Sequence, residues 1–316
     1  MSSVEPTLAA LPNPVLRYFL ATRPPFLTVT LFGCLIGLGS AYANNVPVDW
    51  LKAVATIVFA LVAHAGVNVF NDYYDALNGT DDANTDRLFP FTGGSRFIQN
   101  GVLTTAQTAR FGLVLFVIVM LAGIWLIGVS APGLLYIGLA GLFIGWAYSA
   151  PPLKLNSRGW GELCVAAGFA LIVIGTDFVQ RATFAWFPVI AAVSYALLVT
   201  NILYINQFPD RKADFLAGKR HWVVRLPPAK ARWGYVLIAG AACLWLLGAV
   251  IVGALPWPVL VAFAALIPAA QAARDLLRYA DRPSQLRGAI PKTIASTSLH
   301  GLLLAAGLVA SRLSGA

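Results

Sequence analysis

The sequence predicts an all-α, polytopic membrane protein with nine transmembrane helices around a central cavity. Hydrophobic residues make up 59% of the 316 residues and charged residues only 11%, with a mean hydropathy of +0.74. Soluble domains carry about 25% charged residues, so this composition excludes an ordinary soluble fold. Apolar runs recur along the whole chain, and basic residues concentrate in alternate segments between them. These three observations define the predicted fold class.

A membrane-spanning helix needs roughly 17 to 25 predominantly apolar residues. We predict nine spans, near residues 26–43, 51–70, 109–129, 133–148, 163–179, 187–205, 234–255, 259–273 and 294–308. The first lacks a short apolar core followed by a small-residue cleavage site, so we interpret it as a retained span. Cys34, Cys164 and Cys243 lie within apolar runs, which indicates neither a disulfide framework nor a zinc site.

The basic residues define an orientation. With the N-terminus in the cytoplasm, all of the 22 Lys and Arg residues except Lys52, Arg181 and Arg312 fall on the cytoplasmic side. This distribution is what the positive-inside rule predicts. The net charge of +9 therefore follows membrane topology and gives no reason to expect a nucleic-acid partner. We predict a plasma or inner membrane protein whose N-terminus and active-site loops are cytoplasmic.

The first acidic stretch is residues 68–96, NVFNDYYDALNGTDDANTDRLFPFTGGSR, directly after the second span. Four of its polar residues follow the i, i+3, i+4, i+7 spacing of one helix face: Asn68, Asn71, Asp72 and Asp75. Further carboxylates, including Asp81, follow in a turn-rich segment opened by Asn78-Gly79. A solvated acidic loop is the alternative interpretation for each acid taken singly.

A second stretch repeats this pattern after the sixth span, with Asn206, Asp210 and Asp214. Asn68 and Asp72 precede Asn206 and Asp210 by the same 138 residues. Spans two and six share one orientation, so the two clusters can meet on the cytoplasmic side. The interval predicts an internal repeat of four helices, about residues 21–150 and 160–275. An N-terminal arm (1–20) precedes the repeat, and an extra helix at about 291–312 follows it, all within one domain, 1–316.

Carboxylates without neighbouring His or Cys suit a hard cation, and Mg²⁺ commonly bridges carboxylates to substrate phosphates. Two Mg²⁺ ions do not balance four carboxylates and a diphosphate, and basic residues can cover the remaining charge: Arg96, Lys154, Arg158, Lys219 and Arg220. Lys154 and Arg158 are alternatively no more than positive-inside anchors. A diphosphate at a membrane mouth indicates an isoprenoid, whose tail belongs in the hydrocarbon.

These parts predict a prenyl transfer. Metal and basic residues stabilise the charge that develops on the diphosphate as the allylic C–O bond breaks. An electron-rich acceptor then attacks the allylic cation, and apolar walls exclude water. A membrane transporter is the alternative class, because repeated membrane halves are common there. Transporter sites, however, usually lie near the bilayer midplane, whereas the acids here follow the spans at one face.

The motifs resemble those of the UbiA-type intramembrane aromatic prenyltransferases. NDYYDALNGTD at 71–81 is similar to the first Asp-rich motif of that family, and NQFPDRKAD at 206–214 to the second. The finer pattern resembles the 1,4-dihydroxy-2-naphthoate polyprenyltransferase branch of menaquinone synthesis. The segments that carry this finer resemblance are GGSRFIQNG (93–101), YSAPPLKLNSRGWGE (148–162), VIGTDFVQ (173–180) and GKRHWVVRL (218–226).

The resemblance, which covers about residues 20–226, implies a nine-helix fold, Mg²⁺, a polyprenyl diphosphate and an aromatic acceptor. It implies catalytic metal and diphosphate roles for Asp72, Asp75, Asp210 and Asp214, with Asp81 as a further metal ligand. Substrate contacts are expected from Asn68, Asn71 and Asn206 together with the basic residues above. His221-Trp222 and Phe89-Pro90-Phe91 depart from the branch pattern. Homogentisate, 4-hydroxybenzoate and a chlorophyllide-like ring therefore stay open as acceptors.

Other ionisable residues have competing interpretations. His64 lies one turn before Asn68, either as a neutral group bonded to a neighbouring helix or as a functional group. We expect Asp177 to line a cavity or pair with Arg181, and Glu162 to cap its helix or contact an arginine. The sequence leaves the prenyl chain length and the oligomeric state open.

Overall fold

The computed structural model describes residues 4–315, and this part of the chain is helical with no strand. Eight of its helical segments are long and apolar enough to cross a membrane. They are α2 (Pro24–Ala43), α3 (Trp50–Leu77), α5 (Thr105–Val129), α8 (Gly161–Arg181), α9 (Trp186–Leu216), α11 (Pro228–Ile251), η1 (Trp257–Ala265) continued by α12 (Leu266–Tyr279), and α13 (Ala289–Ser314) with the preceding η2 (Pro283–Gly288). The helix α6 (Leu134–Ser149) is apolar but shorter. The all-α membrane class is confirmed, while the count of nine spans and the four-helix repeat stay predictions.

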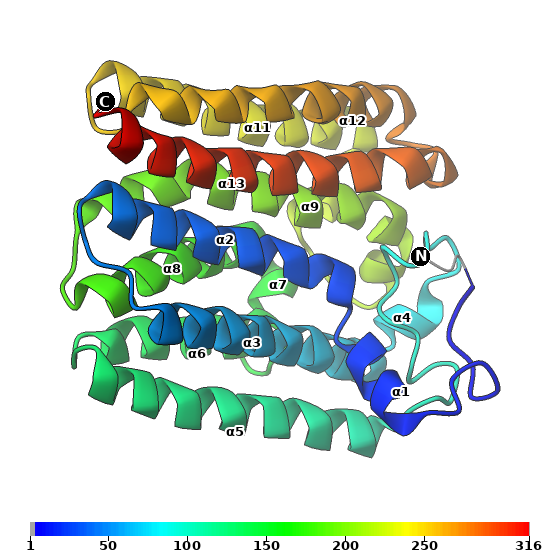
Figure 1. Cartoon of the computed structure of the whole chain (residues 1–316). Coiled ribbons are helices and arrows are strands. Elements are labelled where there is room, and N and C mark those ends of the chain that lie inside the picture. Colours follow the sequence, from blue (N-terminus) through cyan, green and yellow to red (C-terminus); the bar gives the residue numbers. More distant parts are fainter. Residues whose placement is uncertain (1–3, 316) are drawn as a thin grey trace.

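The long helices pack side by side in a closed arrangement (Figure 1). When the shorter α6 is included, each contacts the next one along the chain, and the last, α13, contacts the first, α2. The helices α2, α8 and α9 also contact one another, and α9 is the most buried of the candidate spans. A core cluster that includes Ile36, Tyr195 and Leu304 joins these helices to α13. The cluster fixes α9 at the centre of the fold.

Both motif-bearing helices continue well past their apolar runs, which we predicted to end at residues 70 and 205. The helix α3 begins after Asp49, whose side chain accepts a hydrogen bond from the Lys52 amide, and ends only where Gly79 takes a φ of +77°. The helix α9 continues through Pro209 to Leu216. The motif side chains therefore stand on rigid helix ends, at the end of the molecule that carries α1 (Pro14–Ala21) and α4 (Thr80–Ala83) (Figure 1).

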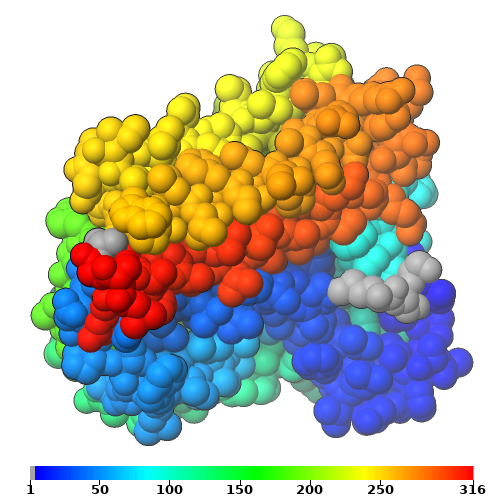
Figure 2. Space-filling model, turned by 45° about the horizontal axis from the view of Figure 1, so that its top comes forward, coloured from blue at the N-terminus to red at the C-terminus, as the bar shows by residue number. Residues whose placement is uncertain are grey.

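The N-terminal arm packs against the segment that follows the first motif. Figure 2 shows the dark-blue N-terminal residues lying beside cyan residues of this segment. The Glu5 carboxylate lies 2.6 Å from Arg87 Nη2 and 3.8 Å from Arg96 Nε, and it accepts a hydrogen bond from Asn100. Burial opposes ionisation, but the bonds from Arg87 and Asn100 and the arginine charges lower the pKa of Glu5. The arm is thus tied to the loop by charge-assisted contacts.

Candidate active site

One face of α3 presents polar side chains to a cavity. Asn68, Asn71 and Asp75 stand at i, i+3 and i+7 and all line it. Asn71 Nδ2 donates to Asp75 Oδ2 (3.3 Å) and to Ser149 Oγ (3.1 Å). Asn78 Nδ2 donates to Asp75 Oδ1 (3.2 Å). These bonds hold the Asp75 carboxylate in place while it faces the cavity.

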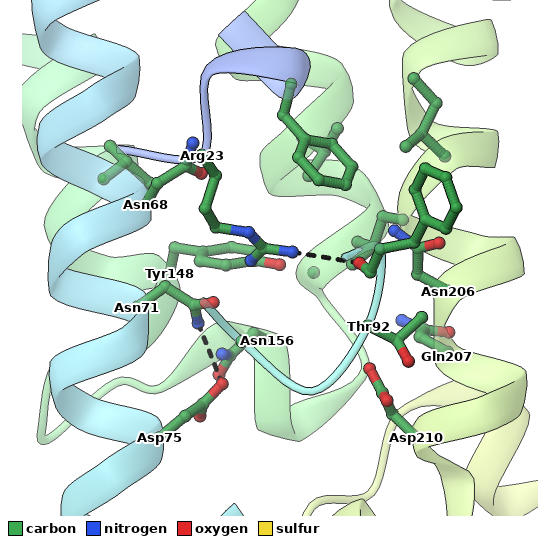
Figure 3. Close-up of a pocket in the computed structure, with 18 of the residues that line it drawn as sticks. Arg23, Asn68, Asn71, Asp75, Thr92, Tyr148, Asn156, Asn206, Gln207 and Asp210 are labelled. Atoms are coloured by element: carbon green, nitrogen blue, oxygen red, sulfur yellow. Dashed lines mark hydrogen bonds between the residues drawn. The ribbon is translucent and has the colours of Figure 1, made fainter. Parts of the chain in front are cut away.

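The matching face of α9 lies across the same cavity. Asn206, Asp210 and Asp214 line it, and Figure 3 shows Asp75 and Asp210 projecting inward from opposite sides. Asn71 and Asp75 precede Asn206 and Asp210 by one common interval of 135 residues. The two acids Asp75 and Asp210, which share the cavity, are therefore related by this interval. The 138-residue interval instead pairs Asp210 with Asp72, which does not line the cavity.

Lys219 connects the two motifs directly. Its Nζ lies 2.9 Å from Asp75 Oδ1 on α3 and 3.1 Å from Asp214 Oδ1 on α9. Burial disfavours the ammonium ion, but the two carboxylates outweigh it and raise the pKa of Lys219. His221 Nε2 lies 2.9 Å from the other Asp214 oxygen. The two acid clusters were predicted to lie close together, and the buried Lys219 contacts an acid of each cluster.

The loop after α4 closes the polar end of the cavity. Asn84 Nδ2 donates to Asp210 Oδ1 (2.5 Å), which joins this loop to α9. Arg96 Nη1 donates to the Asp81 carbonyl (2.5 Å) and does not line the cavity, and burial lowers the pKa of Arg96. Arg96 therefore supports the loop from behind, and Asp81 itself lines the cavity.

Asp72 is buried on a neighbouring face of α3 and does not line the cavity. Its Oδ2 accepts from the Ser95 amide (3.2 Å), and its Oδ1 lies 3.9 Å from Arg23 Nη1. Arg23 also donates to the Phe91 carbonyl (3.1 Å) and lines the cavity (Figure 3). In this arrangement Asp72 positions Arg23 and the loop, whereas Asp75 faces the space where a substrate would lie.

Besides Arg96, three further predicted substrate-binding residues lie away from the cavity: Lys154, Arg158 and Arg220. Arg158 is exposed and donates to the Pro152 carbonyl (2.8 Å), at the end of the short helix α7 (Leu155–Arg158). Arg220 is exposed, and its guanidinium lies 4.7 Å from the centre of the Phe215 ring. These placements differ from the prediction because local backbone and ring contacts hold both arginines at the surface.

Several cavity-lining residues were not singled out as site residues from the sequence. They are Arg23, Asn84, Thr92, Tyr148 and Gln207. Arg23 directly precedes the Pro24-Pro25 start of α2 and has a left-handed φ of 59°. From the sequence, basic residues were only counted on each side of the membrane, and such a count does not distinguish Arg23 from other cytoplasmic arginines.

The deeper half of the cavity is apolar. Its walls come from several helices: Phe26, Val29, Val67, Val165, Phe169, Val199, Ile202 and Leu203. The acids lie at one end and these side chains at the other. Such a site suits a ligand with a charged headgroup and a hydrocarbon chain, because the polar end solvates the charged group and the apolar walls solvate the chain.

The donor set fits Mg²⁺. Asp81 Oδ2, Asn84 Oδ1 and Asn206 Oδ1 are buried oxygens without a hydrogen-bond partner in the described chain, and their residues all line the cavity. Burial and then the charges of Asp75 and Asp72 raise the pKa of Asp81 well above its usual range, so added positive charge would relieve the repulsion. Within residues 4–315, no three His, Cys, Asp or Glu side chains form a complete metal cage. Mg²⁺ suits such an open set, since it keeps waters and shares its coordination with substrate phosphates.

Comparison with known proteins agrees with the geometry. The model of the UbiA prenyltransferase family matches residues 30–310. The chain belongs to the UbiA prenyltransferase family. It is 31% identical over 241 residues to 1,4-dihydroxy-2-naphthoate octaprenyltransferase of Mycobacterium tuberculosis, covering 74% of this chain and 77% of that protein. It is 29% identical to 2-carboxy-1,4-naphthoquinone phytyltransferase of Synechocystis, covering 91% of each chain. The UbiA member described here is therefore a prenyl-transferring enzyme, as predicted.

Solved structures share the fold. A UbiA homolog from Archaeoglobus fulgidus covers 94% of this chain and 99% of its own, with a TM-score of 0.63 and 14% identity. A structure of an Archaeoglobus fulgidus UbiA homolog bound to DMAPP and Mg²⁺ covers 91% and 99%, with a TM-score of 0.58 and 13% identity. At this identity the likeness shows the UbiA fold alone.

Proposed function

We propose that this UbiA-family enzyme transfers a polyprenyl chain from its diphosphate to 1,4-dihydroxy-2-naphthoate, as in menaquinone synthesis. The observation that carries the proposal is a cavity with acids from two helices at one end and apolar walls at the other. The names of the relatives from Mycobacterium tuberculosis and Synechocystis support a naphthoate-type acceptor. The transporter alternative loses its support, because the chain belongs to a prenyltransferase family.

The diphosphate binds at the polar end in this proposal. Asp75, Asp81, Asp210 and Asp214, with the oxygens of Asn84 and Asn206, would hold Mg²⁺ together with the diphosphate. Bound Mg²⁺ would supply a Lewis acid that stabilises the leaving diphosphate. Lys219 and Arg23 line the same space and contribute positive charge next to the phosphate oxygens.

The transfer then proceeds in the apolar half of the cavity. The allylic C–O bond breaks, its electrons leave with the diphosphate, and a ring carbon of the acceptor bonds to the allylic carbon. Attack at the carboxylate-bearing carbon releases CO₂, whose bonding electrons restore the aromatic ring. Phe26, Phe169 and the aliphatic walls exclude water, which would otherwise capture the cation.

The same proposal places the acid cluster on the cytoplasmic side of a plasma or inner membrane. The segments joining the spans near the cluster are rich in basic residues, and such loops are retained in the cytoplasm. Soluble acceptor would then reach the cavity from the cytoplasm while the prenyl chain enters from the hydrocarbon.

A product assay tests this function. Purified enzyme is incubated with Mg²⁺, geranylgeranyl diphosphate and 1,4-dihydroxy-2-naphthoate, and diphosphate, CO₂ and prenylated product are measured. We expect diphosphate and CO₂ in equal amounts and a prenylated naphthalenediol by mass. Homogentisate and 4-hydroxybenzoate serve as competing acceptors, and transfer to either of them with the naphthoate untouched would overturn the proposed acceptor.

A further inference from the structure

The polar stripe of α3 continues beyond the acid cluster into the span. His64, Asn68, Asn71 and Asp75 are spaced at i, i+4, i+7 and i+11, and all four line the cavity. At 1.5 Å per residue, His64 lies ~16 Å from Asp75 along the helix axis and ~6 Å beyond Asn68. The stripe therefore ends on an imidazole in the apolar half of the cavity.

The imidazole of His64 is oriented by a neighbouring helix. Its Nδ1 lies 2.8 Å from Thr30 Oγ1 on α2, and its ring meets Phe169 of α8 edge-on with the centroids 5.5 Å apart. Among residues 4–315, no other side chain or backbone group hydrogen-bonds to this ring. Thr30 thus fixes one ring nitrogen, and Nε2 is left as a single hydrogen-bonding atom beside the apolar walls.

His300 provides the contrast. It is also a histidine inside a spanning helix, and its Nε2 lies 3.1 Å from Ser194 Oγ. It is almost fully buried and does not line the cavity. His300 therefore serves packing between α9 and α13, whereas His64 is partly accessible from a substrate cavity. Polar groups inside membrane spans are costly, so one that faces such a cavity needs a partner there.

We propose that His64 binds a ring hydroxyl of the aromatic acceptor through Nε2, and that Thr30 is the residue that positions the imidazole. This subsite rests on the proposed function. A hydroxyl both donates and accepts a hydrogen bond, so it matches Nε2 in either neutral tautomer. The acceptor ring lies between Phe26 and Phe169, and its hydroxyl contact with His64 determines which ring carbon faces the allylic carbon.

Two substitutions separate this role from structural support. His64→Asn keeps an amide near the Nδ1 position and loses the Nε2 contact, whereas His64→Gln places an amide near Nε2. We expect His64→Asn to raise the KM for 1,4-dihydroxy-2-naphthoate roughly tenfold, with the KM for geranylgeranyl diphosphate unchanged. His64→Gln should stay within about threefold of wild type, because one hydrogen bond is retained. Equilibrium dialysis of the acceptor without donor should give the same order of acceptor affinities, with wild type and His64→Gln binding more tightly than His64→Asn.

Acceptor analogues test the contact itself. In equilibrium dialysis without donor, wild-type enzyme should bind 1-hydroxy-2-naphthoate or 4-hydroxy-2-naphthoate, whichever lacks the contacted hydroxyl, roughly tenfold more weakly than the dihydroxy acid. The His64→Asn enzyme should bind that analogue and the dihydroxy acid equally. Thr30→Val, which removes the orienting hydroxyl at nearly constant volume, should shift the acceptor KM in the same direction.

The controls distinguish the two proposals. His300→Asn is the matched control and should leave the KM for both substrates unchanged. If wild-type enzyme transfers to no aromatic acceptor, the proposed function fails and this subsite with it. If wild-type enzyme is active but His64→Asn changes both KM values equally, or retains discrimination against the mono-hydroxy analogues, the subsite alone is overturned.

Discussion

Lys219 is the most informative single perturbation, because it joins the two acid clusters without a metal. Its ammonium lies 2.9 Å from Asp75 and 3.1 Å from Asp214, and its side chain is 9% exposed. Removing one partner of a buried ion pair costs about 3–5 kcal/mol, since the remaining charge is left uncompensated. We expect Lys219→Met to lower the unfolding free energy of the metal-free protein by about this amount.

Added Mg²⁺ should close part of that difference, because a bound cation supplies positive charge to the same carboxylates. The assay is equilibrium unfolding in detergent, with and without Mg²⁺, for wild type and variant. Lys219→Arg keeps the charge and Lys212→Met removes an exposed lysine of α9, so both should remain close to wild type. A Lys219→Met protein as stable as wild type, or a deficit that Mg²⁺ leaves unchanged, would refute the reasoning.

Three further predictions concern residues around the site. Glu5→Gln should increase hydrogen exchange in residues 84–100. The pKa of Glu5 is lowered in the folded protein. The stabilisation from the Glu5 carboxylate is therefore fully present above pH about 4.5 and is lost as the pH falls through the lowered pKa of the folded state. A wild-type and variant loop that exchange equally at pH 7 would contradict this. Asp177→Asn breaks the 2.7 Å pair with Arg181 and should lower stability while kcat stays within about twofold, as expected for a pair outside the site; turnover reduced in proportion to an Asp75 variant would disprove it. Replacing Arg158 by Gln should change the KM for prenyl diphosphate less than about twofold, since the side chain is exposed outside the cavity; a tenfold increase would restore the role predicted from sequence.

Much of the fold could be predicted because the bilayer imposes its own length and polarity on the chain. The i, i+3, i+4, i+7 spacing of Asn68, Asn71, Asp72 and Asp75 predicted one face of a continuing helix, and α3 does continue to Leu77. Of these four residues, Asp72 does not line the cavity. The ion pair of Asp177 with Arg181 and the bond from His64 to a neighbouring helix were each one of two alternatives, and the structure contains both. Local spacing sufficed for the i, i+4 ion pair, whereas the partner of His64 lies 34 residues away on α2.

The remaining features depended on tertiary contacts that spacing does not encode. The sequence allows two registers between the motifs, one that pairs Asn68 with Asn206 and one that pairs Asn71 with Asn206. Only the packing of α3 against its neighbours places Asp75 in the cavity and Asp72 beside Arg23. Within residues 4–315, Glu162 contacts no arginine, which was one alternative, and its Oε1 accepts a hydrogen bond from Gln207 Nε2 at 3.0 Å. The Asn84 bond to Asp210 spans 126 residues, and no local pattern indicates it.

The central claim is that acids on α3 and α9 act on one diphosphate. The most direct test measures diphosphate release per folded enzyme for wild type, Asp75→Asn, Asp210→Asn and the double variant. Each amide keeps the side-chain size but is a poorer Mg²⁺ ligand, so each single variant should lose about 100-fold or more in turnover. Because the two acids work as a unit, the double variant should be little worse than the poorer single variant. Independent, multiplicative losses, or near-wild-type turnover in either single variant, would contradict a shared site.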